Sequence, residues 1–150
     1  MKTFVIFNPT ASQGHAGKCW PELQKKLEAT HGTFTSFLTQ APGHATRLTR
    51  EALDQGAQKI IAVGGDGTVN EVINGWFEND KPIDPKTIFS VLMCGSGCDF
   101  QRSLNSDSLT KPEVDIQSSD SIPVDVGKVM FQNDSNSECI QYYANIGSLG

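Results

Sequence analysis

One aspartate lies among three glycines, between an apolar run and an amphipathic pattern, within Val63–Gly75. Glycine accepts positive φ and leaves room for a ligand to approach the backbone. A helix that begins after such a turn directs free N–H groups and its positive dipole end at that ligand. Gly64, Gly65 and Gly67 are therefore expected to cradle phosphate groups. Asp66 could hold Mg²⁺ or accept a proton from a hydroxyl substrate, and the sequence leaves both roles open.

The residues around this turn predict the elements that position it. Lys59–Val63 is a nearly continuous apolar run, typical of a strand covered on both faces. The apolar residues after the turn recur at helical spacing and predict a helix over residues 68–78. Thr68 is the expected N-cap, and Glu71 would complete a capping box with it. The apolar face of this helix is formed by Val69, Val72, Ile73, Trp76 and Phe77.

The glycines do not fit either of the two common nucleotide-binding motifs. A dinucleotide fingerprint, G-x-G-x-x-G, fails because Asn70 stands at its third glycine position, and Phe100 does the same in a second candidate. A Walker A loop fails because Cys19 follows Gly17-Lys18. A tight strand-to-helix connection without a ligand is the remaining alternative, but such turns rarely need three glycines around an acid.

Gly64–Gly75 resembles the GGDGTxxEVxNG motif of the diacylglycerol and sphingosine kinase family at every defined position. Shorter matches follow in the order of that family along the whole chain. In the third loop Ser96 stands for the usual Thr, which keeps a hydroxyl, and Cys98 stands for the usual Asn. The shorter matches are Asn8-Pro9 with Ser12 and Gly14, Thr39 before Gly43-His44-Ala45, Gly95-Ser96-Gly97 before Asp99-Phe100, Asp125 with Gly127, and Asn145 with Ser148 and Gly150.

The resemblance implies an ATP- and Mg²⁺-dependent lipid kinase that transfers the γ-phosphoryl group to a diacylglycerol or sphingoid alcohol. Asp66 would be the catalytic and metal-binding residue. The family's catalytic unit is longer, and its second, β-rich half supplies other metal and base residues. By this resemblance the nucleotide-binding residues are Asn8, Thr39, Gly64, Gly65, Asp66, Gly67, Thr68, Asn70, Glu71, Gly95 and Ser96.

Strand and helix patterns alternate along the chain, which predicts an α/β fold: a three-layer parallel sheet with helices on both faces. The proposed ligand residues all follow strand ends, so they should meet at one edge of the sheet. We expect a nucleotide-binding domain over residues 1–121 and the start of a truncated β-rich domain over residues 122–150. Strands are expected at 3–7, 33–38, 59–63, 88–93, 122–131 and 138–146, helices at 16–30, 45–53, 68–78 and 99–104, and a connection at 105–121.

Composition narrows the possible partners. The formal net charge is -5 and no basic run is present, which argues against nucleic-acid binding and against a polybasic grip on anionic lipid. Apolar runs are far shorter than the roughly 20 residues of a membrane span, and no signal peptide is visible. The four cysteines form no C-x-x-C pair, so reduced thiols are expected rather than a zinc site. These features suit a cytoplasmic protein. The family resemblance, rather than composition, implies transient contact with a membrane surface through a further part of the catalytic unit.

Two other functions remain open. An NAD kinase or phosphofructokinase-like enzyme also uses a GGDG loop, although Asn70-Glu71-Val72 with Asn74-Gly75 favours the lipid kinases. A non-catalytic nucleotide-binding domain is the second alternative. If the chain is a fragment, we expect weak ATP binding without lipid phosphorylation. Strands from Ile122 onward would then expose edges that invite self-association.

Overall fold

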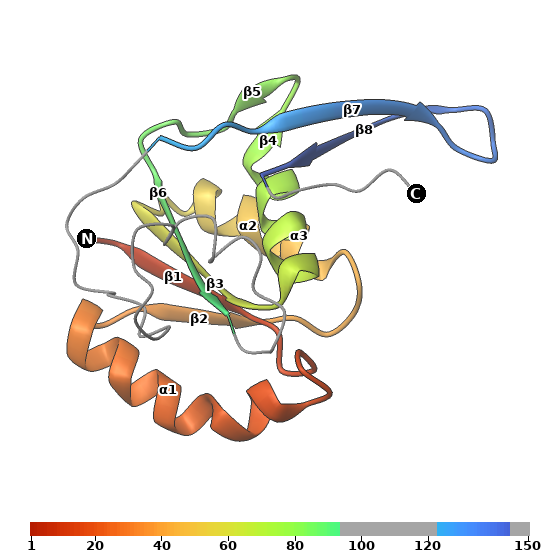
Figure 1. Ribbon diagram of the computed structural model, residues 1–150. Helices are drawn as coiled ribbons and strands as arrows, with labels where there is room; N and C mark the ends of the chain where they lie inside the picture. The colour runs from red at the N-terminus through yellow and green to blue at the C-terminus, as the bar shows by residue number, and fades with distance from the viewer. Residues whose placement is uncertain (94–122, 145–150) are drawn as a thin grey trace, which may run out of the picture.

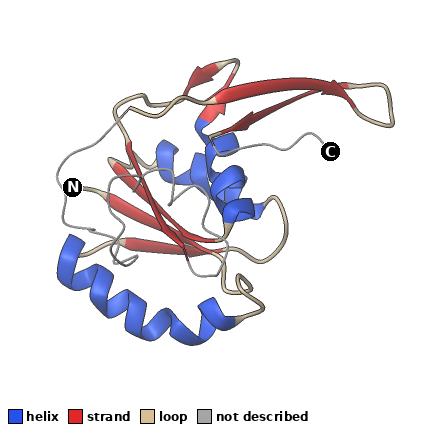
Figure 2. Ribbon diagram, viewed as in Figure 1, coloured by secondary structure: helices blue, strands red, loops and turns tan. Residues whose placement is uncertain are grey.

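A computed structural model describes residues 1–93 and 123–144. Strands and helices alternate through the first part of this chain, and a β-hairpin follows (Figures 1 and 2). In chain order the elements are β1 (Thr3–Phe7), α1 (His15–His31), β2 (Thr35–Leu38), α2 (His44–Asp54), β3 (Lys59–Gly64), α3 (Asp66–Trp76), β4 (Phe77–Glu78), β5 (Lys81–Pro82), β6 (Ile88–Met93), β7 (Gly127–Gln132) and β8 (Glu138–Tyr143).

The central sheet has four parallel strands in the order β2-β1-β3-β6. Helix α1 covers one face, and α2 and α3 cover the other (Figure 1). This arrangement confirms the predicted α/β class. The chain leaves β1 toward β2 and then crosses back to β3 on the other side of β1. The carboxyl ends of β1 and β3 therefore flank a topological switch point, where open α/β sheets bind ligands.

Alternation along the strands builds two cores. On β1, Phe4 and Ile6 face α2 and α3, whereas Val5 and Phe7 face α1, and all four are at most 1% exposed. Trp20 stacks on Phe7 with ring centroids 4.2 Å apart. Because both faces of the inner strands are covered, their sequences read as continuous apolar runs.

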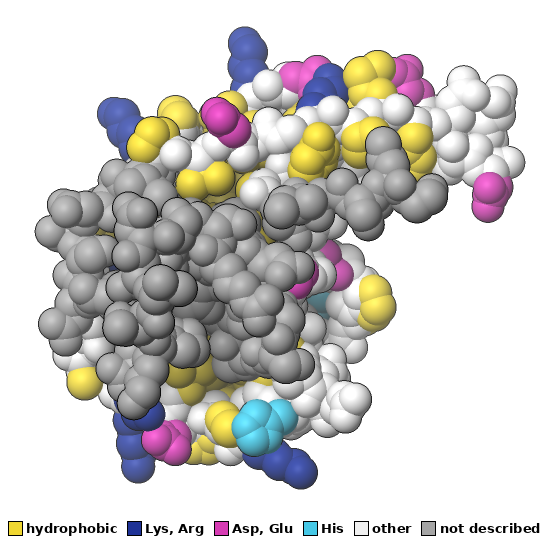
Figure 3. Space-filling view, in the orientation of Figure 1, with side chains coloured by type: hydrophobic (Ala, Val, Ile, Leu, Met, Phe, Trp, Pro, Cys, Tyr) yellow, Lys and Arg dark blue, Asp and Glu magenta, His cyan; other side chains and the backbone are white. Residues whose placement is uncertain are grey.

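The hairpin of β7 and β8 extends from the body of the molecule, and its two strands pair antiparallel as predicted. Apolar side chains gather along it on the surface (Figure 3). Met130 is 57% exposed, and Phe131 and Ile140 are each almost half exposed. Predicted self-association through this hairpin stays a prediction.

The third predicted helix is shifted. It begins at Asp66 and ends at Trp76, rather than covering residues 68–78. Phe77 therefore leaves the predicted helix face and starts β4, because Asn79 and Asp80 adopt left-handed conformations that suit a two-residue hairpin turn. Pro82 lies in the two-residue edge strand β5, where a missing N–H is tolerated.

Several predictions lie outside the described residues. They concern the third loop with Gly95 and Ser96, the helix at 99–104, the connection at 105–121 and the segment at 145–150. The domain boundary after residue 121 also stays a prediction. Within residues 1–93 and 123–144, no helix has the length and apolar character needed to cross a membrane.

His31, at the end of α1, predicts a dependence of stability on pH. Its buried Nε2 has no hydrogen-bond partner among the described residues. Burial, with a smaller effect of the Lys59 charge, lowers the pKa of His31 below 6.5. The unfolded chain then binds the proton more readily, so the free energy of unfolding should fall as the pH drops from 6.5 toward the folded pKa.

Urea unfolding at pH 7.5 and at pH 5.5 tests this prediction. His31→Gln cannot titrate in this range, so it should show a smaller loss of stability on acidification than the unsubstituted chain. His15→Gln, at an exposed position on the same helix, is the matched control and should keep the full loss. An identical pH dependence in the His31→Gln protein would contradict the assignment.

Candidate functional site

Asn8 follows β1 at the switch point and connects it to the glycine turn. Its N–H donates to Val63 O at 2.8 Å, and its Nδ2 donates to Thr68 Oγ1 at 3.1 Å. Its Oδ1 accepts from Thr10 N–H and Thr10 Oγ1, which orders the start of the β1–α1 loop. The structure thus brings Asn8 together with Thr68, as the sequence predicted.

The glycines of the turn serve close approach rather than unusual backbone conformation. Glycine was expected here partly because it tolerates positive φ, but Gly64, Gly65 and Gly67 all have negative or extended φ angles. A Cβ at position 64 would overlap the side chain of Thr68, so Gly64 lets α3 start directly against the strand end. No atom of the described residues lies within 4 Å of a Cβ built at Gly65 or Gly67, so this part of the chain leaves room beside their backbone.

Thr68 is not the N-cap of α3, which corrects the predicted capping box. Gly65 holds that position in an extended conformation, and Thr68 lies inside the helix with its hydroxyl bonded to Asn8. The helix begins earlier because the N–H groups of Thr68 and Val69 already bond to Gly65 O at 3.0 and 3.1 Å. Asp66 consequently becomes the first residue of the helix.

Asp66 combines features of a ligand-binding carboxylate. It lies in the first turn of α3, where the helix dipole stabilises negative charge. Its Oδ1 is buried but has no hydrogen-bond partner among the described residues. The N–H groups of Asp66 and Gly67 likewise have no acceptor among those residues. A buried acceptor without a partner is costly, and a bound cation would satisfy it, while the two N–H groups could bind the anion that accompanies the cation.

Thr39 lies at the neighbouring strand end. Its N–H donates to Phe7 O at 2.9 Å, which extends the pairing of β1 with β2 by one residue and places Thr39 beside Asn8. The next loop turns at Gly43, where φ is 79°. Asn8, Thr39 and the glycine turn therefore share one edge of the sheet, as predicted.

Glu71 has a different environment from the open turn. Its Oε1 accepts from Gly43 N–H at 2.8 Å and its Oε2 accepts from Ala45 N–H at 3.0 Å. Thr46 Oγ1 also donates to Glu71 O at 2.9 Å. The carboxylate predicted to cap its own helix caps α2 instead. Both oxygens are used by this cap, so direct contact of Glu71 with a nucleotide remains only a prediction.

Asn74, on the next turn of α3, was not predicted as a site residue although the resembled motif contains it. Its Nδ2 donates to Tyr142 O at 2.8 Å, and its Oδ1 accepts from Tyr142 N–H at 2.9 Å. The amide thus pairs with β8 as a neighbouring strand would. Its Nδ2 also lies 2.8 Å from Asn70 O and 3.4 Å from Asn70 Oδ1, so Asn70 belongs to the same joint.

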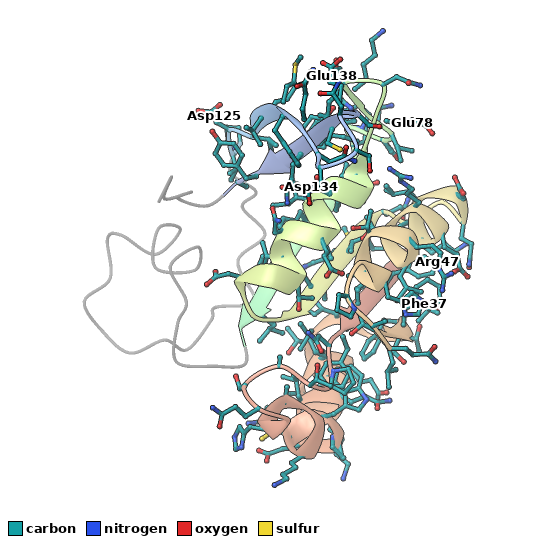
Figure 4. All side chains as sticks on the ribbon, turned by 90° about the vertical axis from the view of Figure 1, so that its right-hand side faces the viewer. Phe37, Arg47, Glu78, Asp125, Asp134 and Glu138 are labelled. Carbon is teal, nitrogen blue, oxygen red and sulfur yellow. The ribbon has the colours of Figure 1, made fainter. Side chains whose placement is uncertain are left out.

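The hairpin lies at the end of α3 (Figure 4), and other contacts support this joint. Phe77 and Tyr142 stack with ring centroids 4.3 Å apart. Asp80 accepts from Tyr142 Oη at 2.6 Å and from Lys128 Nζ at 2.7 Å. The bonds from Lys128 and Tyr142 lower the pKa of Asp80, and the bond to Asp80 raises the pKa of Tyr142. Helix α3 therefore carries the candidate ligand site at its start and the hairpin at its end.

The comparisons with known proteins agree with this geometry. Residues 2–129 match the family described as the diacylglycerol kinase catalytic domain. The chain is 35% identical over 148 residues to a diacylglycerol kinase of Staphylococcus carnosus, which covers 97% of this chain and 44% of that protein. It is 30% identical over 148 residues to a diacylglycerol kinase of Bacillus subtilis, covering 97% and 45%.

A solved structure of a diacylglycerol kinase from Bacillus anthracis is also similar. It superposes with a TM-score of 0.56 at 30% sequence identity, over 69% of this chain and 34% of that one. This chain therefore spans less than half the length of these relatives. The parallel sheet, the glycine turn and these matches together show that the chain belongs to the diacylglycerol kinase catalytic domain family.

Proposed function

We propose that the chain forms the nucleotide-binding part of an ATP- and Mg²⁺-dependent lipid kinase with a diacylglycerol-like or sphingoid alcohol substrate. The observation that carries this proposal is the buried Oδ1 of Asp66 at the start of α3, which has no hydrogen-bond partner in the described part of the chain, in a member of the diacylglycerol kinase family. A membrane lipid substrate would require at least transient contact with a membrane surface from a cytoplasmic protein.

Each part of the sheet edge has a distinct task in this proposal. The N–H groups of Asp66 and Gly67 bind phosphate oxygens, with the positive end of α3 behind them. Asn8 fixes the glycine turn through Thr68. Thr39 forms the wall on the side of β2. Gly95 and Ser96, outside the described residues, are assigned to nucleotide binding by resemblance alone.

Asp66 fits a magnesium ion. Mg²⁺ in phosphotransferases binds one or two protein carboxylates together with substrate phosphates and water. In the part of the chain that the structure describes, no group of three or more His, Cys, Asp or Glu could hold a metal by itself, which suits an ion shared with a nucleotide. A bound Mg²⁺ would neutralise charge on the phosphates. Asp66 Oδ1 would hold the ion, directly or through water, or accept the proton of the lipid hydroxyl.

A substrate panel separates this function from its rivals. The longest natural form of the protein would be incubated with ATP, Mg²⁺ and either diacylglycerol, sphingosine or NAD. Phosphorylation of a lipid alone supports the proposal, whereas phosphorylation of NAD alone supports the small-molecule kinase alternative. ATP binding without transfer to any of these acceptors would support a non-catalytic nucleotide-binding domain.

The chain of 150 residues should bind ATP without phosphorylating a lipid. We expect calorimetry to detect weak ATP binding that strengthens when Mg²⁺ is added. Lipid phosphorylation should be undetectable, because positioning can supply about 7–11 kcal/mol of a barrier, and this chain spans less than half the length of the kinases it matches. Sustained, linear lipid phosphorylation by this chain, with its mass verified, would contradict the expectation.

A further inference from the structure

We propose that Glu71 is a positioning residue that holds the β2–α2 loop, residues 39–43, in the shape that nucleotide binding requires. This role rests on the proposed function. Glu71 lies on the second turn of α3, yet both carboxylate oxygens bind the backbone of α2, at Gly43 N–H and Ala45 N–H. One side chain thus bridges the helix that carries Asp66 and the loop that follows Thr39.

Helix α2 cannot supply this cap itself. Its N-cap is Gly43, which has no side chain, and its first turn contains no acidic residue. The first N–H groups of a helix have no acceptor within the helix, and leaving them buried without partners is costly. A carboxylate makes charge-assisted hydrogen bonds to such groups and also interacts favourably with the helix dipole. Glu71 provides both effects from a neighbouring helix.

The loop is fixed at both ends by these contacts. At its start, Thr39 N–H donates to Phe7 O, and Gln40 N–H donates to His44 Nδ1 at 3.1 Å. At its end, Glu71 holds Gly43. Asp66 and Glu71 lie on the same helix, separated by about 7.5 Å along its axis at 1.5 Å per residue. Helix α3 therefore sets the position of the loop relative to Asp66.

The same carboxylate directs anions to one of two neighbouring helix ends. A free helix N-terminus attracts phosphate, and α2 and α3 both begin at this edge of the sheet. Glu71 already occupies the N-terminus of α2, whereas Asp66 N–H and Gly67 N–H at the start of α3 lack acceptors among the described residues. The nucleotide phosphates are thereby directed to α3.

Calorimetric titration of the chain with ATP and Mg²⁺ tests the positioning role, at a temperature where circular dichroism shows every variant folded. Glu71→Ala should raise the dissociation constant about tenfold, as expected if the competent loop conformation becomes ten times rarer. Glu71→Gln keeps one acceptor oxygen and should give an intermediate value. Glu51→Ala removes an equal charge from an exposed position on α2 and should bind as the unsubstituted chain does.

Rescue by acetate distinguishes the loss of this cap from a general loss of stability. At constant ionic strength, acetate can occupy the vacated N–H groups of Gly43 and Ala45. It should raise the melting temperature of the Glu71→Ala chain and recover part of its ATP affinity, with no effect on the unsubstituted or Glu51→Ala chains.

Two results would overturn the inference. The first is an ATP affinity that does not change in Glu71→Ala or, if that variant does not fold, in Glu71→Gln. The other is an ATP affinity that falls in Glu71→Ala and that acetate does not restore. Absence of ATP binding by the unsubstituted chain would instead refute the proposed function. The melting temperature in acetate would then still report whether Glu71 caps α2.

Discussion

Replacing Asp66 with asparagine is expected to lower turnover at least about a hundredfold in the longest natural form of the protein, the usual scale for one electrostatic or proton-transfer group. The substitution keeps the shape of the side chain and removes its charge. Because Asp66 lies at the open start of α3 and not in either core, the fold should survive. Initial rates of lipid phosphorylation, with circular dichroism as the test of folding, measure both expectations.

A matched change elsewhere controls for charge. Asp54→Asn removes an equal charge from an exposed position at the end of α2, far from the glycine turn in the fold, and should leave turnover nearly unchanged. In the 150-residue chain, Asp66→Asn should also abolish the strengthening of ATP binding by Mg²⁺. Near-normal turnover in the Asp66→Asn protein would show that Asp66 is not a catalytic residue.

Gly75→Ala should destabilise the chain strongly. A Cβ at this position would overlap Thr46 O and lie 2.6 Å from Thr49 Cβ, so α2 and α3 would have to move apart. Overpacking typically costs about 1–3 kcal/mol and occasionally more. Because the overlap here involves a backbone oxygen, we expect a cost at the upper end of this range, above the roughly 1 kcal/mol that alanine gains over glycine inside a helix. Urea unfolding followed by circular dichroism should show a lower midpoint.

Gly67→Ala is the matched control on the same helix. A Cβ at Gly67 meets no atom of the described residues within 4 Å, and the backbone there is not left-handed. Its unfolding midpoint should therefore equal or slightly exceed that of the unsubstituted chain, since alanine also has the higher helix propensity. ATP affinity should fall nonetheless, since the methyl group would enter the proposed phosphate cradle. A Gly75→Ala chain as stable as Gly67→Ala would show that the two helices tolerate separation.

The sequence predicted the parts of the fold that depend on local periodicity. The strand predicted at Lys59–Val63 is observed at Lys59–Gly64, and the apolar face of α3 was predicted except for the extra residue Phe77. Both predictions rest on apolar patterns typical of a strand covered on two faces and of an amphipathic helix. The shared edge of Asn8 and Asp66 also follows from sequence, because parallel strands place their carboxyl ends together. These features can be predicted without knowing which side chains contact one another across the fold.

The remaining features depend on contacts between distant residues. Thr68 and Glu71 have the spacing of a capping box, but Asn8, 60 residues away, binds Thr68, and Gly43 and Ala45 bind Glu71. Asn74 likewise pairs with Tyr142, 68 residues away. Sequence patterns such as the capping box consider only residues that are close along the chain, so they cannot tell whether a side chain will bind a nearby or a distant partner. The defined positions of the resembled motif offered a signal for Asn74, although not for its partner.

The cap supplied by Glu71 has a consequence for how the molecule folds. Helix α2 has 11 residues, fewer than the roughly 12–15 at which an isolated helix becomes marginally stable in water. Without a cap of its own, α2 should gain lasting structure only after α3 has formed against it. The two helices should then open and close as one cooperative unit, with matched hydrogen-exchange protection, and on the ribosome α2 would wait for residues synthesised after it.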